Sequence, residues 1–599
     1  MSEFYEDQVL GKAYDSQMMR RLLRYLKPYR KQVALAVTLI VVISGLKIVG
    51  PYLTKVAIDD HIRTGDLAGL NALGLWYVSI LVVLFGLEYL QNYLLNTIGQ
   101  RVMYDLRMQI FSHTQGLDVS YFDRTPVGRV MTRITSDVDA LNELFTSGVV
   151  TIAGDIVNLS GIVLALFWMN PALAGLMFSV LPLIVLVTFI FKIKVRDNYR
   201  LVRKLIARIN SFLQESITGM LVIQIFARER RKFDQFAKIN KEHLDANLQA
   251  VLYYSLFYPA IELIGAVAVA LVIWYGGGQV VQGAMTLGAL VAFLQYSERF
   301  FQPISDLTEK YNILQTAMAS AERIFVLLDT RPSVTSPAQP LPAPDAPAAI
   351  EFRNVWFAYK DETWVLRDVS FRVGEGERVA LVGATGSGKT TIINLLTRFY
   401  DVARGEVLIN GADLRRYDLQ ELRRLFGVVL QDVFLFSGTV EGNLSLNDPS
   451  VTPERVRQAA RMVHVDRFIG RLPGGYGEEV RERGSAFSVG EKQLLSFARA
   501  LAFDPKILIL DEATSSVDTE TELLIQDAIQ KLMKGRTSII IAHRLSTIQD
   551  ADRIIVMHKG AIREVGTHQE LLAQRGIYYR LYQLQYKDQY GRPAPAGEA

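Results

Sequence analysis

The chemistry of this chain is clearest in one glycine-rich octamer, Gly383-Ala-Thr-Gly-Ser-Gly-Lys-Thr390. It matches the pattern G-x-x-x-x-G-K-[ST], in which backbone N–H groups surround phosphate oxygens and the lysine reaches the terminal phosphates. The hydroxyl of Thr390 has the place of a Mg²⁺ ligand in this pattern. The residues that we expect to contact a nucleotide here are Gly383, Thr385, Gly386, Ser387, Gly388, Lys389, Thr390 and Thr391.

A second chemical signal is an apolar run that ends in two carboxylates, Ile507-Leu-Ile-Leu-Asp511-Glu512. A buried strand followed by acids suits a metal-associated aspartate and a general base. We expect Asp511 to hold Mg²⁺ through water and Glu512 to polarise the attacking water. Together with the octamer, this run predicts nucleotide hydrolysis.

The elements around the octamer are those that its pattern requires. Residues 377–383 read as a strand, and an apolar-faced helix follows from Thr391. The helix presents its positive N-terminus to the phosphates. From Ile350 onward, short β-rich runs alternate with helices, which is typical of an α/β phosphate-binding domain.

Composition separates this part from the rest of the chain. The 599 residues have a mean hydropathy of +0.18 and a net charge of only +4, which indicates a membrane portion and gives no reason to expect a nucleic-acid partner. The absence of cysteine excludes disulfides, thiolate metal sites and a cysteine-nucleophile protease domain. The acidic N-terminus lacks the layout of a cleavable signal, so we expect it to stay in the cytoplasm.

Six membrane crossings are expected in the first half of the chain. The apolar stretches that carry them are Val33–Leu53, Leu67–Leu87, Ile156–Phe191 and Leu263–Ser297. The third stretch has 36 residues without charge, too long for one crossing, and the turn signal Asn170-Pro171 divides it. By the same logic we expect the fourth to turn at Gly276-Gly277-Gly278.

The basic residues orient these crossings. Seven Lys and Arg precede the first span, five lie between residues 97 and 143, and thirteen lie between 192 and 250. Both termini and both long loops are therefore expected in the cytoplasm. The loops read as helical, with turns near 116–128 and 214–221 farthest from the bilayer, and the amphipathic segment 16–31 is expected to lie in the membrane surface.

Ionisable residues inside membrane spans are candidates for function because they are costly there. They are Lys47, Glu88, Asp155 and Glu262 and, near a cytoplasmic end, Glu298 with Arg299. Two interpretations stay open. Some of them, Glu88 and Glu262 before the others, line a cargo path, or they pair with one another, lie near an interface or lie in the cytoplasmic extension of the helices.

A proline-rich stretch places the domain boundary, with six prolines between residues 331 and 349. We expect a membrane domain over 1–328, a linker over 329–349 and an ATPase domain over 350–599. The aromatic tail from Tyr578 to Tyr590 is either a helix against that domain or a loose end.

In its motifs and their order, the chain resembles an ABC exporter half-transporter over nearly its whole length. The resemblance implies a six-helix membrane domain fused before an α/β ATPase domain that binds ATP and Mg²⁺. It implies that Tyr359 stacks on adenine, that Gln431 touches the metal, that Asp518 belongs to the D-loop, and that His543 lies near the γ-phosphate. The segment from Glu479 to Gly484 lies where such exporters meet their membrane loops.

One motif departs from the family pattern. Where the family usually has Leu-Ser-Gly-Gly-Gln, this chain has Phe-Ser-Val-Gly-Glu, ending at Glu491. Ser488 and Gly490 remain to bind the γ-phosphate held by the other subunit. Val489 hinders close backbone approach and Glu491 brings an acid near an anion, so we expect a weakened contact.

Because Glu512 is kept and this motif is altered, the resemblance implies a heterodimer with a different half-transporter. That partner is expected to have an intact signature and a residue other than Glu at the position of Glu512. The predicted function is ATP-driven export of hydrophobic or amphipathic molecules, drugs or lipids, across the cytoplasmic membrane. The alternatives are a homodimeric lipid flippase and an ATP-gated channel on the same scaffold.

Overall fold

A computed structural model of the chain describes residues 15–344, 348–360, 362–511, 519–541 and 548–589. The chain divides into two compact units. The first comprises residues 1–115 and 127–330, and the second comprises residues 116–126 and 331–599. We describe each unit by itself.

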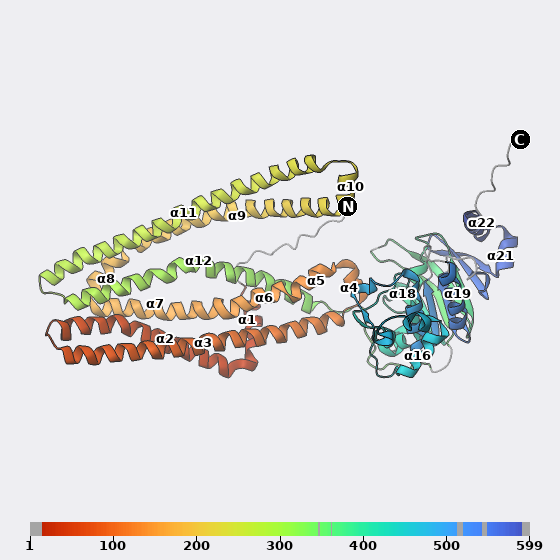
Figure 1. The fold of residues 1–599 in the computed structure, drawn as a ribbon, viewed down its shortest axis with the longest axis horizontal. Helices are drawn as coiled ribbons and strands as arrows, with labels where there is room; N and C mark the ends of the chain where they lie inside the picture. The colour runs from red at the N-terminus through yellow and green to blue at the C-terminus, as the bar shows by residue number, and fades with distance from the viewer. Residues whose placement is uncertain (1–14, 345–347, 361, 512–518, 542–547, 590–599) are drawn as a thin grey trace. The chain divides into compact units, whose positions relative to one another are not determined.

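The first unit is made of long helices joined by short turns (Figure 1). Its elements are α1 (Ser16–Leu23), η1 (Arg24–Tyr29), α2 (Arg30–Val56), η2 (Ala57–Ile62), α3 (Leu67–Gln115), α5 (Val127–Ile134), α6 (Ser136–Glu143), η3 (Leu144–Gly148), α7 (Val149–Met169), α8 (Pro171–Phe178), α9 (Leu181–Thr218), α10 (Met220–Ile225), α11 (Glu229–Val281) and α12 (Leu287–Asp329). At about 1.5 Å per residue, α3 alone is roughly 70 Å long, more than twice a ~30 Å hydrocarbon core. The membrane helices therefore continue beyond the bilayer, as expected.

Five stretches of helix are long and apolar enough to cross a membrane among the described residues. The break at Asn170 is confirmed, because α7 ends at Met169 and Pro171 begins α8. The Asn170 side chain caps α8 by accepting a hydrogen bond from the Leu173 N–H at 3.0 Å. The sixth expected crossing falls in α12, where the side chains of residues 302–309 and 311 lie outside the described part.

The expected turn at the glycine triplet is wrong. Gly276, Gly277 and Gly278 lie inside α11, and the chain reverses only after Val281. A Cβ on Gly276 would stand 2.7 Å from Leu290, so this glycine permits close packing of α11 against α12. The glycine that serves the turn is Gly283, whose φ is +75°.

The amphipathic segment near the N-terminus packs against other helices of the first unit. Asp15 caps α1, and Met19 and Leu22 are buried. Arg21 forms two hydrogen bonds of 2.6 and 2.7 Å with Asp329 at the end of α12. These contacts anchor the helix that precedes the first span.

The second unit contains the predicted ATPase domain, and we call it the ATPase unit. It is built on two larger sheets. One is antiparallel, in the order β2 (Leu366–Val373), β1 (Ile350–Phe357), β4 (Arg404–Ile409), β5 (Ala412–Asp413). The other has the order β12 (Ala561–Gly566), β11 (Arg553–His558), β3 (Arg378–Val382), β10 (Thr537–Ile541), β9 (Ile507–Asp511), β6 (Phe426–Val429). All of its neighbouring pairs are parallel except β11 with β12.

Helices and short elements complete this unit. They are α4 (Val119–Arg124), α13 (Lys389–Leu396), η4 (Leu414–Arg416), α14 (Leu419–Arg424), β7 (Gly438–Thr439), α15 (Val440–Ser445), α16 (Pro453–Met462), α17 (Val465–Ile469), η5 (Gly475–Gly477), β8 (Glu479–Val480), η6 (Glu482–Gly484), α18 (Val489–Ala502), α19 (Thr519–Met533), α21 (His568–Gln574) and α22 (Ile577–Gln589).

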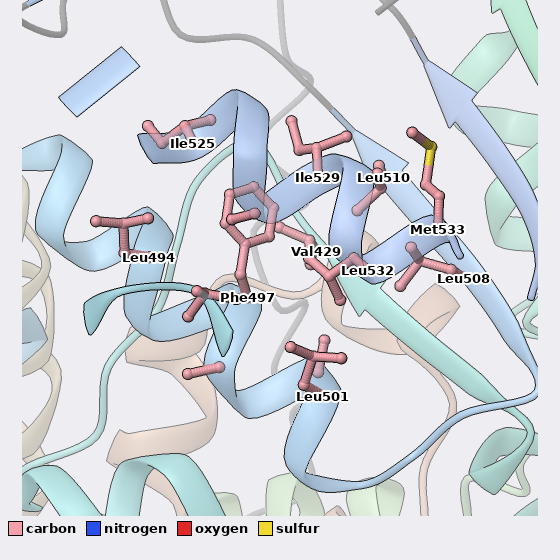
Figure 2. Packing of buried hydrophobic residues seen from close by; sticks show 14 of the residues in the cluster. Val429, Leu494, Phe497, Leu501, Leu508, Leu510, Ile525, Ile529, Leu532 and Met533 are labelled. Carbon is pink, nitrogen blue, oxygen red and sulfur yellow. The ribbon is translucent and has the colours of Figure 1, made fainter. Parts of the chain in front are cut away.

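A continuous apolar core joins α18 and α19 to the parallel sheet (Figure 2). Its members include Val429, Leu494, Phe497, Leu501, Leu508, Leu510, Ile525, Ile529, Leu532 and Met533. Nearly continuous apolar strands are expected when helices cover both faces of a parallel sheet. The core thus fixes the carboxyl ends of β9 and β6, where site residues follow.

The proline-rich stretch and the aromatic tail, whose state the sequence left open, both contact the ATPase unit. In the proline-rich stretch, the N–H of Leu341 donates to the carbonyl of Arg416 at 2.8 Å. The tail is a helix, α22, and its Tyr578 is only 1% exposed. Glu564 caps this helix, accepting from the N–H of Ile577 at 2.5 Å and of Tyr578 at 3.0 Å.

Candidate nucleotide site

The parallel sheet brings the chemical residues to one edge. The octamer follows β3, Asp511 ends β9, and Gln431 comes two residues after β6. Because carboxyl ends of parallel strands share an edge, loops from separate parts of the chain converge there. Ligands of open α/β sheets bind outside this edge.

The glycines of the octamer are required by its geometry. Gly386 and Gly388 have φ of +79° and +104°, a region that L-residues rarely adopt. A Cβ on Gly383 would stand 2.4 Å from the carbonyl oxygen of Met557. The loop therefore follows a path that other residues cannot take, and it delivers Lys389 to the first turn of α13.

Lys389 is buried, with 7% of its surface exposed. Its Nζ donates to the carbonyls of Gly383 at 2.7 Å and Ala384 at 3.2 Å. Burial lowers the pKa of Lys389, and the charge of Asp511 partly opposes that effect. An anion beside this ammonium would raise its pKa again.

A second observation also indicates that the loop fits the phosphates of a nucleotide. The Ser387 hydroxyl is buried and has no hydrogen-bond partner among the described residues. Buried polar atoms of this kind are normally satisfied by a ligand or water. Thr390, the expected metal ligand, is exposed at the start of the same helix. A nucleotide bound at this loop would supply the phosphoanhydride bond for hydrolysis.

Tyr359 lies beside α13, as an adenine-stacking residue requires. Its hydroxyl donates to Thr391 Oγ1 at 3.2 Å and accepts from Asn394 Nδ2 at 3.1 Å. Its ring packs edge-on against Tyr400, with centroids 5.1 Å apart. These contacts fix the ring at the side of the phosphate loop.

Ser488 is the N-cap of α18, and its polar groups bond within that helix. Its hydroxyl accepts from the Glu491 N–H at 3.2 Å, and Glu491 Oε2 accepts from the Ser488 N–H at 2.7 Å. This is a capping box. Gly490 is buried, whereas the Val489 side chain is 57% exposed.

Three expected site residues, Glu512, Asp518 and His543, lie outside the described part of the chain. Of the others, the structure brings the octamer, Thr391, Asp511, Gln431 and Tyr359 to one region, and it places Ser488 and Gly490 on α18. Among the described residues, no hydrogen bond joins Ser488 to the phosphate loop.

Sequence reasoning missed the residues by which α4 contacts the ATPase unit. Asp123 accepts a hydrogen bond from the Tyr400 hydroxyl, and Arg124 Nη2 donates to the Tyr359 carbonyl at 3.4 Å. Burial and the Asp123 carboxylate raise the pKa of Tyr400. The sequence predicted a turn near residues 116–128 that is available to touch another domain, but it did not indicate which residues would make the contact.

Two family descriptions match this chain, "ABC transporter transmembrane region" over residues 33–304 and "ABC transporter" over residues 366–515. The chain belongs to the ABC transporters. The second match includes the phosphate loop, Asp511 and the capping box, so this transporter's ATPase unit binds ATP and couples its hydrolysis to transport. The first unit, with the apolar helices, and the ATPase unit share one chain, in the order that is typical of exporters.

Relatives agree with the exporter class. An ATP-dependent lipid A-core flippase of Syntrophus aciditrophicus is 37% identical over 95% of both chains. A probable multidrug resistance ABC transporter ATP-binding/permease protein of Bacillus subtilis is 40% identical over 87% of this chain and 77% of its own. The solved structure of a bacterial Atm1-family ABC exporter with ATP bound is 28% identical, with a TM-score of 0.77 over 95% of this chain and 99% of that one.

Proposed function

We propose that this chain is one half of an ATP-driven exporter of hydrophobic or amphipathic molecules in the bacterial cytoplasmic membrane. The observation that carries the proposal is the phosphate loop, with its buried Lys389 and orphaned Ser387 hydroxyl, in a chain that also has apolar helices long enough to span a bilayer. Relatives named for lipid A-core, multidrug and fatty acid transport support cargo of this kind.

The metal and catalytic roles belong to the same proposal. Thr390, Gln431 and Asp511 hold Mg²⁺, because hydroxyl, amide and carboxylate oxygens are the ligands it prefers. Glu512 acts as general base, and His543 donates to a phosphate oxygen. The distribution of Lys and Arg supports cytoplasmic termini and a cytoplasmic ATPase unit.

The partner is a different half-transporter. In the capping box, the Ser488 N–H donates to the Glu491 carboxylate at 2.7 Å, so a negative charge lies at the start of the signature helix. That carboxylate also repels an anion. A signature of this kind fits a site that hydrolyses ATP slowly, which suits an asymmetric pair in which the partner supplies the intact signature.

The test is purification of the chain from its native host, alone and with whatever half-transporter co-purifies. We expect the mixed dimer to hydrolyse ATP and to accumulate a fluorescent amphiphile in inverted vesicles. A stable dimer of this chain alone with ordinary turnover would overturn the mixed pair. Conductance that depends on ATP, without accumulation, would instead establish the channel alternative.

A further inference from the structure

In the first unit, called the membrane unit from here on, two charged side chains form an ion pair, and a third contacts the backbone of one of them. Lys47 of α2 forms an ion pair with Glu88 of α3, with Nζ and Oε1 2.8 Å apart. Arg299 of α12 donates from Nη1 to the carbonyl oxygen of Lys47 at 2.6 Å. The Lys47 and Glu88 side chains are 47% and 41% exposed, so this cluster is accessible rather than sealed in the helix packing.

The cluster lies deep in the span. Asp59, near the end of the first hairpin, binds the start of α12 by accepting from the Gly288 N–H at 2.9 Å. Counting from that contact, Lys47 lies about 18 Å along α2 and Arg299 about 17 Å along α12, at 1.5 Å per residue. In the other direction, Arg30 at the start of α2 is about 25 Å from Lys47. Lys47 therefore lies inside the apolar stretch Val33–Leu53, and Arg299 lies two residues beyond the stretch Leu263–Ser297.

Part of the role of Arg299 is structural. Pro51 lacks an N–H, so the Lys47 carbonyl four residues earlier has no partner within α2. Arg299 supplies the missing donor, as a membrane helix requires. One turn away, the neutral Tyr296 hydroxyl makes a similar bond to the Ile48 carbonyl at 2.5 Å.

The charge of Arg299 is not explained by that bond. A neutral donor would satisfy the carbonyl, whereas a cation inside a membrane span carries a cost, which reaches about 2.5–3.5 kcal/mol at the bilayer centre. The described residues place no carboxylate at ion-pairing distance from the guanidinium, and Glu88 is already paired with Lys47. The three side chains thus carry one net positive charge, and Arg299 keeps N–H donors beyond the one it uses.

We propose that Lys47, Glu88 and Arg299 form a binding site for the anionic head group, phosphate or carboxylate, of an amphiphilic cargo. This inference rests on the proposed export function and narrows its cargo. The bond to the Lys47 carbonyl holds the guanidinium in place, and its remaining donors match a phosphate or carboxylate bidentately. Phe85, 75% exposed and one turn from Glu88 on α3, provides apolar surface for the cargo's tail.

The experiment uses the full chain with its partner in phosphatidylcholine nanodiscs. Dioleoylphosphatidic acid is titrated, and the half-saturating concentration for stimulated ATP hydrolysis is measured. Inorganic phosphate and oleylamine are the comparison ligands. We expect stimulation by phosphatidic acid, none by inorganic phosphate at equal concentration, and little by oleylamine, whose cationic head meets a net positive site.

Four variants separate charge from structure. Arg299→Gln should raise the half-saturating concentration roughly tenfold or more, the size of a charge-assisted hydrogen bond, and Arg299→Lys should recover much of the loss. Glu88→Gln should lower it severalfold, because it removes the negative charge beside Lys47. Lys55→Gln, a matched loss of a cation farther along α2, should leave it unchanged.

The signs of these effects decide the outcome. If Glu88→Gln weakens the response as much as Arg299→Gln, or if Lys55→Gln does, the anion site is wrong. Stimulation by inorganic phosphate equal to that by phosphatidic acid overturns the assignment to a cargo head group. Stimulation by oleylamine in every variant also counts against this inference alone, whereas no stimulation by any amphiphile in the unsubstituted transporter counts against the proposed export function.

Discussion

Replacing Glu491 by glutamine separates two effects of one side chain. In the capping box, Glu491 Oε2 accepts from the Ser488 N–H at 2.7 Å, and its own N–H donates to Ser488 Oγ at 3.2 Å. Glutamine keeps an acceptor in the same place, because both residues serve at this position of the box. It removes only the negative charge.

The expected magnitudes differ for stability and for nucleotide binding. Loss of the charge near the N-terminus of α18 costs about 0.3–1 kcal/mol. Alanine also loses the hydrogen bond, for a total of about 1–2 kcal/mol. Like-charge repulsion across several ångströms of partly hydrated protein amounts to about 0.5–1 kcal/mol. Glu491→Gln should therefore tighten nucleotide binding roughly twofold to fivefold at the site whose γ-phosphate the partner holds.

The assay is a nucleotide titration of the assembled transporter, together with its thermal unfolding midpoint. The matched control is Glu570→Gln, because Glu570 forms the same box with Thr567 at the start of α21, with an N–H to Oε2 distance of 2.9 Å. We expect similar changes in unfolding midpoint for both glutamine variants but tighter nucleotide binding only for Glu491→Gln. Weaker or unchanged binding in Glu491→Gln would refute the argument that its charge weakens the signature.

Three other outcomes are expected. Glu512→Gln should lower hydrolysis roughly 10²–10⁴-fold without loss of ATP binding, measured by turnover and nucleotide titration, and an unchanged rate would remove Glu512 as the base. Asp123→Asn weakens the acceptor of the Tyr400 hydroxyl. If α4 couples cargo binding to hydrolysis, this variant should reduce cargo-stimulated hydrolysis more than basal hydrolysis. Equal reduction of both would contradict a coupling role for α4. Burial lowers the pKa of His568, whose Nδ1 lies 2.6 Å from the Tyr578 hydroxyl. Because the unfolded chain binds the proton more readily, stability should fall as pH drops below about 6.5, and thermal unfolding of His568→Gln should lack this dependence.

Several features of this protein follow from local sequence. The phosphate loop depends on glycines at fixed positions, and the α7–α8 break depends on Asn170 and Pro171, so neighbouring residues are enough to predict both. The exporter architecture followed from apolar runs and from motifs in a known order. In each case the determining contacts lie within a few residues of one another.

Other features depend on residues far apart in the chain. The glycine triplet resembled a turn, but Leu290, which follows in α12, makes Gly276 a packing position inside α11. Lys47, Glu88 and Arg299 were each suspected alone, yet only the packing of α2, α3 and α12 brings them together and leaves one cation in excess. Periodicity assigns a residue to a face of its own helix, but it does not say which helix that face meets. That partner is selected by the packing of the whole unit, and so it is decided by tertiary structure.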